Sequence, residues 1–173
     1  MEKISIAGTY IVWKNKLLIH KRNTTGSEAS WNKLAAPGGK LEKGEDFLTA
    51  AIRELQEESG LVLTKRGFKV LNTIQSDAAD SIMYIRNLSK KPVVGGPQDS
   101  GSKKAIDMKF TFDSIEGESA GPGYYWADIE SLLGFLDKNK EYNNPYFYKN
   151  IVLVQKYLKK NTLKGKTLKK RRV

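Results

Sequence analysis

The segment Gly39–Leu61 constrains the fold more than any other, because it sets a glycine-containing loop before a helix with two distinct faces. Residues 45–59 are predicted to be helical, and Gly60 is placed to end the helix. Three acidic side chains recur at spacings of three and four and therefore share one face: Glu54, Glu57 and Glu58. An apolar stripe lies roughly 120° away at 100° per residue: Leu48, Ala51, Ile52 and Leu55. The helix can bury this stripe against a sheet and still present a row of carboxylates.

Three clustered carboxylates repel one another, so a positive group is expected among them. Arg53 and Glu57 form an i,i+4 pair that offsets part of the repulsion, and a divalent ion would offset more. The chain has no cysteine and one histidine, which excludes disulfides, thiolate zinc sites, iron–sulfur clusters and a cysteine nucleophile. Oxygen ligands favour Mg²⁺, Mn²⁺ or Ca²⁺, and Mg²⁺ typically binds through one or two carboxylates plus substrate phosphates. A solvated helix laced with salt bridges is the other interpretation of the three glutamates alone.

The order of the remaining elements predicts an α/β protein in which helices cover a sheet. Residues 4–13 and 16–20 read as a hairpin with Lys14-Asn15 in its tight turn. Further strands are expected at 34–37, 68–75, 81–88, 105–112 and 124–126, with loops at 89–103 and 114–123. A helix capped by Asp128 is expected over 129–136, and Pro145 begins a last helix with apolar residues at helical spacing.

The charge of +11 is concentrated at the end of the chain. Residues 156–173 hold nine basic residues and no acid, so the 173-residue chain is divided into a domain at 1–160 and a flexible basic tail at 161–173. Such a tail attracts polyanions such as RNA, although a solvated helix end explains it as well. No apolar run approaches the ~18 residues of a membrane span, and Met1–Ile6 has no signal-peptide core. A cytoplasmic protein without membrane contact is expected.

Residues 39–61 fill the pattern Gly-x5-Glu-x7-Arg-Glu-U-x-Glu-Glu-x-Gly-U, in which U is a bulky aliphatic residue. All nine specified positions match: Gly39, Glu45, Arg53, Glu54, Leu55, Glu57, Glu58, Gly60 and Leu61. The chain thereby resembles the Nudix hydrolases, and the order of its flanking elements is similar to theirs from about residue 4 to about 158. The resemblance implies an α/β/α sandwich around a mixed β-sheet.

The resemblance also implies an activity and a set of site residues. Nudix enzymes hydrolyse a pyrophosphate bond in a nucleoside diphosphate linked to another moiety, with Mg²⁺ or, in its place, Mn²⁺. Glu57, Glu58 and Glu54 would hold the metal with the carbonyl of Gly39, and Glu54 would be a ligand or the general base. Arg53 would orient the carboxylates, and Glu45 would brace Arg53. A distant loop carboxylate sometimes serves as base in this family, which makes Glu118, followed by Glu116, a candidate.

Sequence motifs typical of several Nudix subfamilies are missing, which leaves hydrolysis of nucleoside triphosphates as the leading interpretation. No proline lies between Leu61 and Lys91, unlike in ADP-ribose hydrolases, and the first tyrosine after residue 61 is Tyr84. Removal of an RNA cap or 5′-end phosphates, aided by the basic tail, is the runner-up, and a non-catalytic nucleotide- or RNA-binding module is the third candidate. Substrate contacts could come from Arg22, Trp31 and Tyr84, whereas His20 is expected to be structural. The oligomeric state stays open, a homodimer included.

Overall fold

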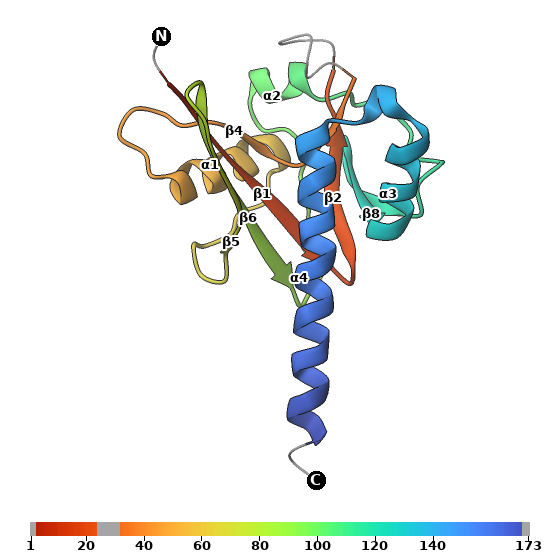
Figure 1. Cartoon of the computed structure of the whole chain (residues 1–173). Coiled ribbons are helices and arrows are strands. Elements are labelled where there is room, and N and C mark those ends of the chain that lie inside the picture. Colours follow the sequence, from red (N-terminus) through yellow and green to blue (C-terminus); the bar gives the residue numbers. More distant parts are fainter. Residues whose placement is uncertain (1–2, 24–31, 171–173) are drawn as a thin grey trace.

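The computed structural model describes residues 3–23 and 32–170, with side chains as far as Thr162. Within these residues, eight strands form one mixed sheet (Figure 1). The strands are β1 Ile4–Trp13, β2 Lys16–Lys21, β3 Leu34–Ala35, β4 Gly38–Lys40, β5 Lys69–Gln75, β6 Ala79–Leu88, β7 Gly117–Gly121 and β8 Tyr124–Asp128. Their order is β5-β6-β1-β2-β8-β7, with β3 paired to β2 and β4 to β1. The β1–β6 pair is parallel and the other pairs are antiparallel.

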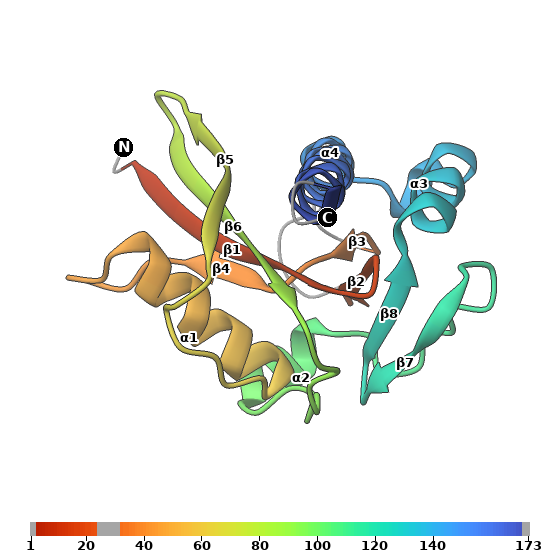
Figure 2. The same cartoon turned by 90° about the horizontal axis from the view of Figure 1, so that it is seen from below.

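Helices cover both faces of this sheet (Figure 2). The helices α1 Phe47–Ser59 and α2 Ser100–Ala105 lie on one face, and α3 Ile129–Lys138 and α4 Pro145–Lys170 lie on the other. A short 3-10 turn at Lys140–Tyr142 lies between α3 and α4. Leu55 of α1 packs with Ile11, Leu18 and Trp126 on the first face. Residues of α3 and α4, such as Leu132 and Ile151, pack against Tyr10 and Val12 on the second. The predicted α/β/α sandwich is confirmed.

Local sequence signals set several of the element ends. Lys14 and Asn15 both have positive φ, 47° and 61°, as the predicted tight hairpin turn requires. Asp46 caps α1 by accepting a hydrogen bond from the Thr49 amide at 2.9 Å. Gly60 ends α1 in the left-handed conformation, with φ of 70°, and Asp128 caps α3. The hairpin and the helices predicted at 45–59 and 129–136 therefore form within about two residues of their predicted bounds.

Three sequence predictions are wrong. The expected loop at 89–103 contains the start of α2, which Asp99 caps. Residues 105–112 were expected to form a strand, but Ile106 makes only an isolated bridge to Arg22, and a turn follows in which Asp107 accepts a hydrogen bond from the Lys109 amide. This aspartate-centred turn overrides the apolar alternation. Residues 114–123 were expected to be a loop but contain β7, an edge strand paired with β8. A side chain at Gly117 would overlap the Trp126 carbonyl, so only a residue without Cβ allows this close pairing.

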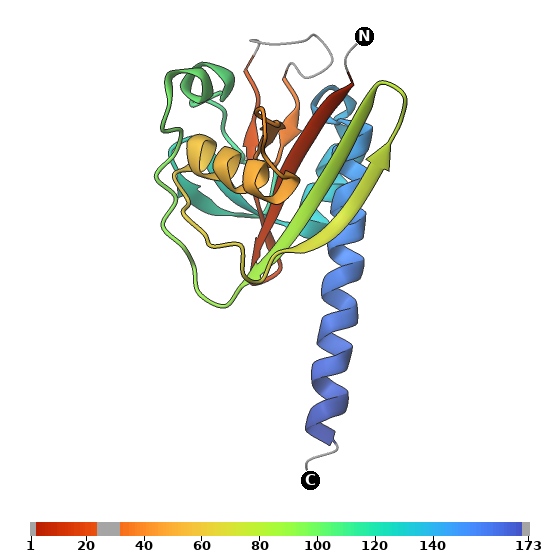
Figure 3. The same cartoon turned by 90° about the vertical axis from the view of Figure 1, so that its left-hand side faces the viewer.

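The last helix extends well beyond the rest of the domain (Figures 1 and 3). Its helical backbone runs continuously from Pro145 to Lys170, across the predicted domain boundary at residue 160. The division into a domain and a flexible tail stays a prediction, and we keep the name basic tail for residues 161–173. Among the described helices, none combines the length and the apolar character that crossing a membrane demands.

Candidate active site

Helix α1 holds the three predicted carboxylates in three different environments. Glu58 continues the buried stripe of Ala51 and Leu55 at helical spacing and is only 6% exposed. The side chain of Glu54 is 16% exposed and that of Glu57 is 40% exposed. The sequence predicted one row of presented carboxylates, whereas the structure turns Glu58 toward the sheet and Glu57 toward solvent. The tertiary contact with the sheet causes this difference, because the apolar stripe of α1 seats the helix with Glu58 at its buried edge.

The backbone of β4 passes directly over two of these carboxylates. The Gly38 amide donates a hydrogen bond of 2.9 Å to Oε2 of Glu58. A Cβ atom at Gly39 would overlap the carboxylate of Glu54, so the glycine lets the chain approach this side chain closely. Glu54 and Glu58 therefore lie against the Gly38–Gly39 backbone, and Glu57 lies farther out.

Arg53 ties the outer carboxylates together. Its Nε and Nη2 donate hydrogen bonds of 2.9 and 3.0 Å to the two oxygens of Glu45, a bidentate pair. Its Nη1 donates to Glu54 and to Glu57, each at 3.0 Å, and Nη2 also reaches the Lys40 carbonyl at 3.0 Å. The hydrogen bond from Arg53 lowers the pKa of Glu45, and Glu45 in turn raises the pKa of the guanidinium. Arg53 thus links α1 to the loop before it.

Glu58 and Glu54, the two carboxylates beside the Gly38–Gly39 backbone, are compensated only in part. Burial raises the pKa of Glu58 to about 8, and the Gly38 amide opposes this shift only in part. Burial also raises the pKa of Glu54, against the opposing hydrogen bond from Arg53. Negative charge at these two positions is therefore under-neutralised by the chain itself.

The donor set fits a hard divalent cation. Carboxylate and carbonyl oxygens are the ligands that Mg²⁺ and Mn²⁺ take, and a cation would supply the positive charge that Glu58 lacks. In the described part of the chain, no three Asp, Glu, His or Cys side chains converge as a ready-made metal cluster. The ligands would therefore come from Glu54, Glu57 and Glu58 together with backbone oxygen of the adjacent Gly39.

A fourth carboxylate faces this site, and sequence reasoning missed it. Asp99 accepts hydrogen bonds from Ser102 as the cap of α2, and it adds to the effect of burial in raising the pKa of both Glu54 and Glu58. The preceding segment holds it there, because the Gln98 amide donates to the Glu57 carbonyl at 2.7 Å and the Gly96 amide donates to the Ser59 carbonyl at 3.0 Å. An aspartate three residues before Ser102 was a helix-cap signal inside the expected loop.

Glu118, predicted as a distant catalytic carboxylate, lies in the edge strand β7 and forms ion pairs with Lys16 and Lys91. These two lysines hold its pKa at about 2. Figure 2 shows β7 at the opposite edge of the sheet from β5, whereas α1 lies over the β1–β6 side. The amide of Glu116, the second candidate, is bound by the Ser131 hydroxyl near α3. The structure brings neither residue to the α1 carboxylates.

Of the three residues predicted to contact the substrate, only Arg22 lies near the carboxylates. Arg22 lies close enough to Glu58 to lower the pKa of that carboxyl, although burial of Glu58 dominates. Tyr84 packs beneath α1 against the cluster of Ala7, Ala50 and Ala51. Trp31 lies outside the described residues.

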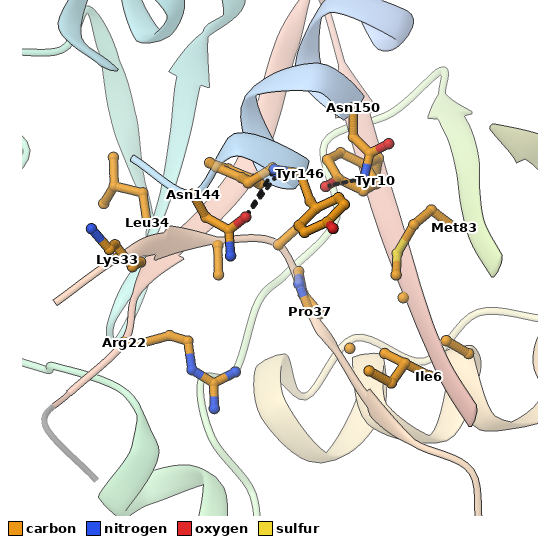
Figure 4. A pocket seen from close by; sticks show the side chains of 16 residues that line it. Ile6, Tyr10, Arg22, Lys33, Leu34, Pro37, Met83, Asn144, Tyr146 and Asn150 are labelled. Atoms are coloured by element: carbon orange, nitrogen blue, oxygen red, sulfur yellow. Dashed lines mark hydrogen bonds between the residues drawn. The ribbon is translucent and has the colours of Figure 1, made fainter. Parts of the chain in front are cut away.

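A pocket of about 180 Å³ opens beside the site, on the other side of β4 (Figure 4). Its lining includes Gly38, whose amide binds Glu58, so one residue joins the pocket to the carboxylates. Tyr146 and Asn144 from the start of α4 line one part of it, and Arg22 reaches past Pro37 away from Tyr146. The Nε atom of Arg22 is buried and has no hydrogen-bond partner among the described residues. The pocket therefore has an aromatic and amide end and a cationic end.

Comparison with known proteins agrees with this geometry. A segment of 80 residues is 35% identical to the 8-oxo-dGTP diphosphatase of Escherichia coli (strain K12) and covers 46% of this chain and 60% of that protein. The chain spans 40% and 60% of the length of the curated relatives it matches.

Solved structures show the same fold at low identity. A MutT structure from a study of Aliivibrio salmonicida and Vibrio cholerae has a TM-score of 0.56 at 20% identity and covers 87% of this chain and 98% of its own. The T. brucei MERS1–RNA complex has a TM-score of 0.64 at 14% identity, with 88% and 63% coverage. The family model of the NUDIX domain matches residues 5–150, which hold the carboxylates, the Gly38–Gly39 backbone and Asp99. With most of its length matched, the chain belongs to the NUDIX domain family.

Proposed function

We propose that this protein hydrolyses a pyrophosphate bond in a nucleoside diphosphate linked to another moiety, with a nucleoside triphosphate as its substrate. The observation that carries the proposal is the position of Gly38. Its amide binds Glu58 on one side of β4, and the same residue lines the pocket of about 180 Å³ on the other. A substrate seated in the pocket would bring its phosphates to the carboxylates over a short path.

Glu58, Glu54 and Glu57, with the Gly39 carbonyl, would hold Mg²⁺ or, in its place, Mn²⁺. When bound, such an ion neutralises charge on the phosphoryl oxygens and lowers the pKa of the attacking water. Arg53 holds Glu54 and Glu57 in place through its two 3.0 Å hydrogen bonds, and Glu45 fixes Arg53.

We assign Glu54 the role of the proton acceptor. Burial raises its pKa, which moves it toward the range in which a carboxylate accepts a proton from water near neutral pH. Asp99 adds negative charge on the same side and would support either the ion or the attacking water. We assign Asp99, in place of Glu118, the role of the distant carboxylate.

The two ends of the pocket suit the two ends of a nucleotide. Tyr146 is 64% exposed and offers an aromatic face on which a base can stack, and Asn144 beside it offers an amide. Arg22 also lines the pocket and is close enough to Glu58 to lower the pKa of that carboxyl, so its guanidinium can bind phosphate near the carboxylates. A volume of about 180 Å³ is below the 300–1,000 Å³ of pockets for drug-sized ligands, so it suits a single base with the phosphates outside it.

The pocket favours a free nucleotide over a long polymer. The curated relative with 35% identity is named an 8-oxo-dGTP diphosphatase, which supports a triphosphate substrate. Removal of RNA caps or 5′-end phosphates remains the second candidate, because the chain carries the basic tail and a structural neighbour is an RNA complex. A non-catalytic module would not need under-neutralised glutamates beside a pocket. A cytoplasmic location would supply both nucleotides and Mg²⁺.

The test measures the release of phosphate or pyrophosphate from a panel of substrates in the presence of millimolar Mg²⁺. The panel contains normal and oxidised nucleoside triphosphates, ADP-ribose, dinucleoside polyphosphates and capped RNA. We expect turnover of triphosphates, a raised KM with Arg22→Gln, and kcat lowered roughly 100-fold by Glu58→Gln. Turnover confined to capped RNA would replace the leading proposal by the second, and no turnover of any substrate would favour the binding module.

A further inference from the structure

Three polar side chains are buried beneath the end of α1 without hydrogen-bond partners. They are Thr9 on β1, His20 on β2 and Tyr124 on β8, with exposed fractions of 0%, 1% and 2%. Among the described residues, the Thr9 hydroxyl, both ring nitrogens of His20 and the Tyr124 hydroxyl are unpaired. Buried polar groups in native proteins are nearly always paired, so this group calls for an explanation.

All three side chains point to the face of the sheet that α1 covers. Side chains alternate along a strand, and Ile11, Leu18 and Trp126, two residues from them, pack against Leu55 of α1. His20 and Tyr124 are direct partners in the β2–β8 register, and their rings meet edge to face with centroids 5.2 Å apart.

Two of these three residues lie close to Glu58, Thr9 through the backbone beside it and Tyr124 through its hydroxyl. The Thr9 amide donates to the Pro37 carbonyl at 2.9 Å, next to Gly38, whose amide binds Glu58. Burial raises the pKa of the Tyr124 hydroxyl, and the nearby Glu58 carboxylate raises it further. A carboxylate can accept about four hydrogen bonds, and Gly38 gives Oε2 of Glu58 one of them.

We propose that Tyr124 and Thr9 are positioning residues that donate hydroxyl hydrogen bonds to Glu58 when this carboxylate binds a divalent cation, with His20 fixing the Tyr124 ring. The inference rests on the proposed function and goes beyond it, because it assigns a role to residues outside the carboxylate set. Hydroxyl donors suit this place, since they stabilise a buried charge without adding a competing one. Partners behind a metal ligand typically change metal affinity 10- to 100-fold.

The test compares Tyr124→Phe with Tyr125→Phe as a matched control. Tyr125 is the next residue on β8 and faces the other side of the sheet, where its hydroxyl donates to the Ile115 carbonyl at 2.9 Å. Mn²⁺ binding to the metal-free full-length protein is measured by titration calorimetry, and Tm is measured without metal. We expect Tyr124→Phe to weaken Mn²⁺ binding at least tenfold with an unchanged or higher Tm, and Tyr125→Phe to leave Mn²⁺ binding unchanged.

Two further variants keep the proposal falsifiable. Thr9→Val keeps the shape of a branched strand residue and removes only the hydroxyl, so a loss of Mn²⁺ affinity with an unchanged Tm would support the proposal independently. In Glu58→Gln, adding Tyr124→Phe should cause no further loss of Mn²⁺ affinity, because the hydrogen bond has lost its charged acceptor.

The outcomes separate this inference from the proposed function. Normal Mn²⁺ binding by Glu58→Gln would overturn the metal assignment itself. Weak binding by Glu58→Gln with normal binding by Tyr124→Phe and Thr9→Val would overturn only the positioning role. A loss of affinity in these two variants that merely follows a lower Tm would also overturn it, since a structural defect then explains the loss.

Discussion

Replacing Glu58 with glutamine should raise the stability of the metal-free protein while it lowers kcat roughly 100-fold. Glu58 is 6% exposed, and burial raises its pKa from 4.5 to about 8. Below pH 4.5 the folded and unfolded states both hold the proton, so the side chain costs nothing. As the pH rises to 8, the unfolded state loses the proton first, and the folded state is progressively destabilised relative to it.

The magnitude follows from the size of this window. About 3.5 pH units at 1.36 kcal/mol each set an upper bound of ~5 kcal/mol above pH 8. The pKa of about 8 already includes the Gly38 hydrogen bond, and local relaxation around the charge reduces the gain further, so we expect about 2 kcal/mol from the neutral amide. For a chain of this size that corresponds to a Tm increase of roughly 4–8 °C.

The assay is thermal unfolding followed by circular dichroism in chelator, from pH 4 to pH 9, for the wild type, Glu58→Gln and Glu57→Gln. The Tm advantage of Glu58→Gln should be near zero at pH 4 and grow through the window from 4.5 to 8. Glu57 is 40% exposed and bonded to Arg53, so its replacement should give no such advantage. Equal Tm values for Glu58→Gln and the wild type at pH 9 would refute the reasoning.

Four further predictions concern the rest of the site and the basic tail. Chelation of divalent ions should abolish turnover without unfolding, as activity and circular dichroism on one sample would show, and full turnover in excess chelator would contradict the metal assignment. Arg53→Ala should cost about 2 kcal/mol or more in urea unfolding and lower kcat, because it removes bonds to three carboxylates. Asp99→Asn retains a good helix cap and should lower kcat about tenfold, whereas Glu118→Gln should leave kcat unchanged; the opposite ranking would return Glu118 to the site. Deleting residues 162–173 should change kcat/KM for triphosphates less than about threefold, whereas an RNA substrate would show a salt-dependent KM that flattens on truncation.

The sequence determined the elements whose signals are local. The spacing of Arg53, Glu54, Glu57 and Glu58 defined the carboxylate helix, and the signals at Gly60 and Asp128 set helix ends close to the observed ones. The pairing of Arg53 with Glu57 also follows from one helical turn. These features depend on residues within a few positions of one another, so they can be predicted from the amino-acid sequence.

Tertiary structure alone decided the differences among the carboxylates and their partners. Glu57 and Glu58 are neighbours in sequence, yet the docking of α1 on the sheet buries one and exposes the other. Asp99 rather than Glu118 reaches the site, because backbone bonds from Gly96 and Gln98 dock its segment on the end of α1. The pocket joins Arg22, Gly38 and Tyr146 from three separate parts of the chain. Burial and long-range proximity depend on how elements pack together, and the spacing of residues along one element does not contain that information.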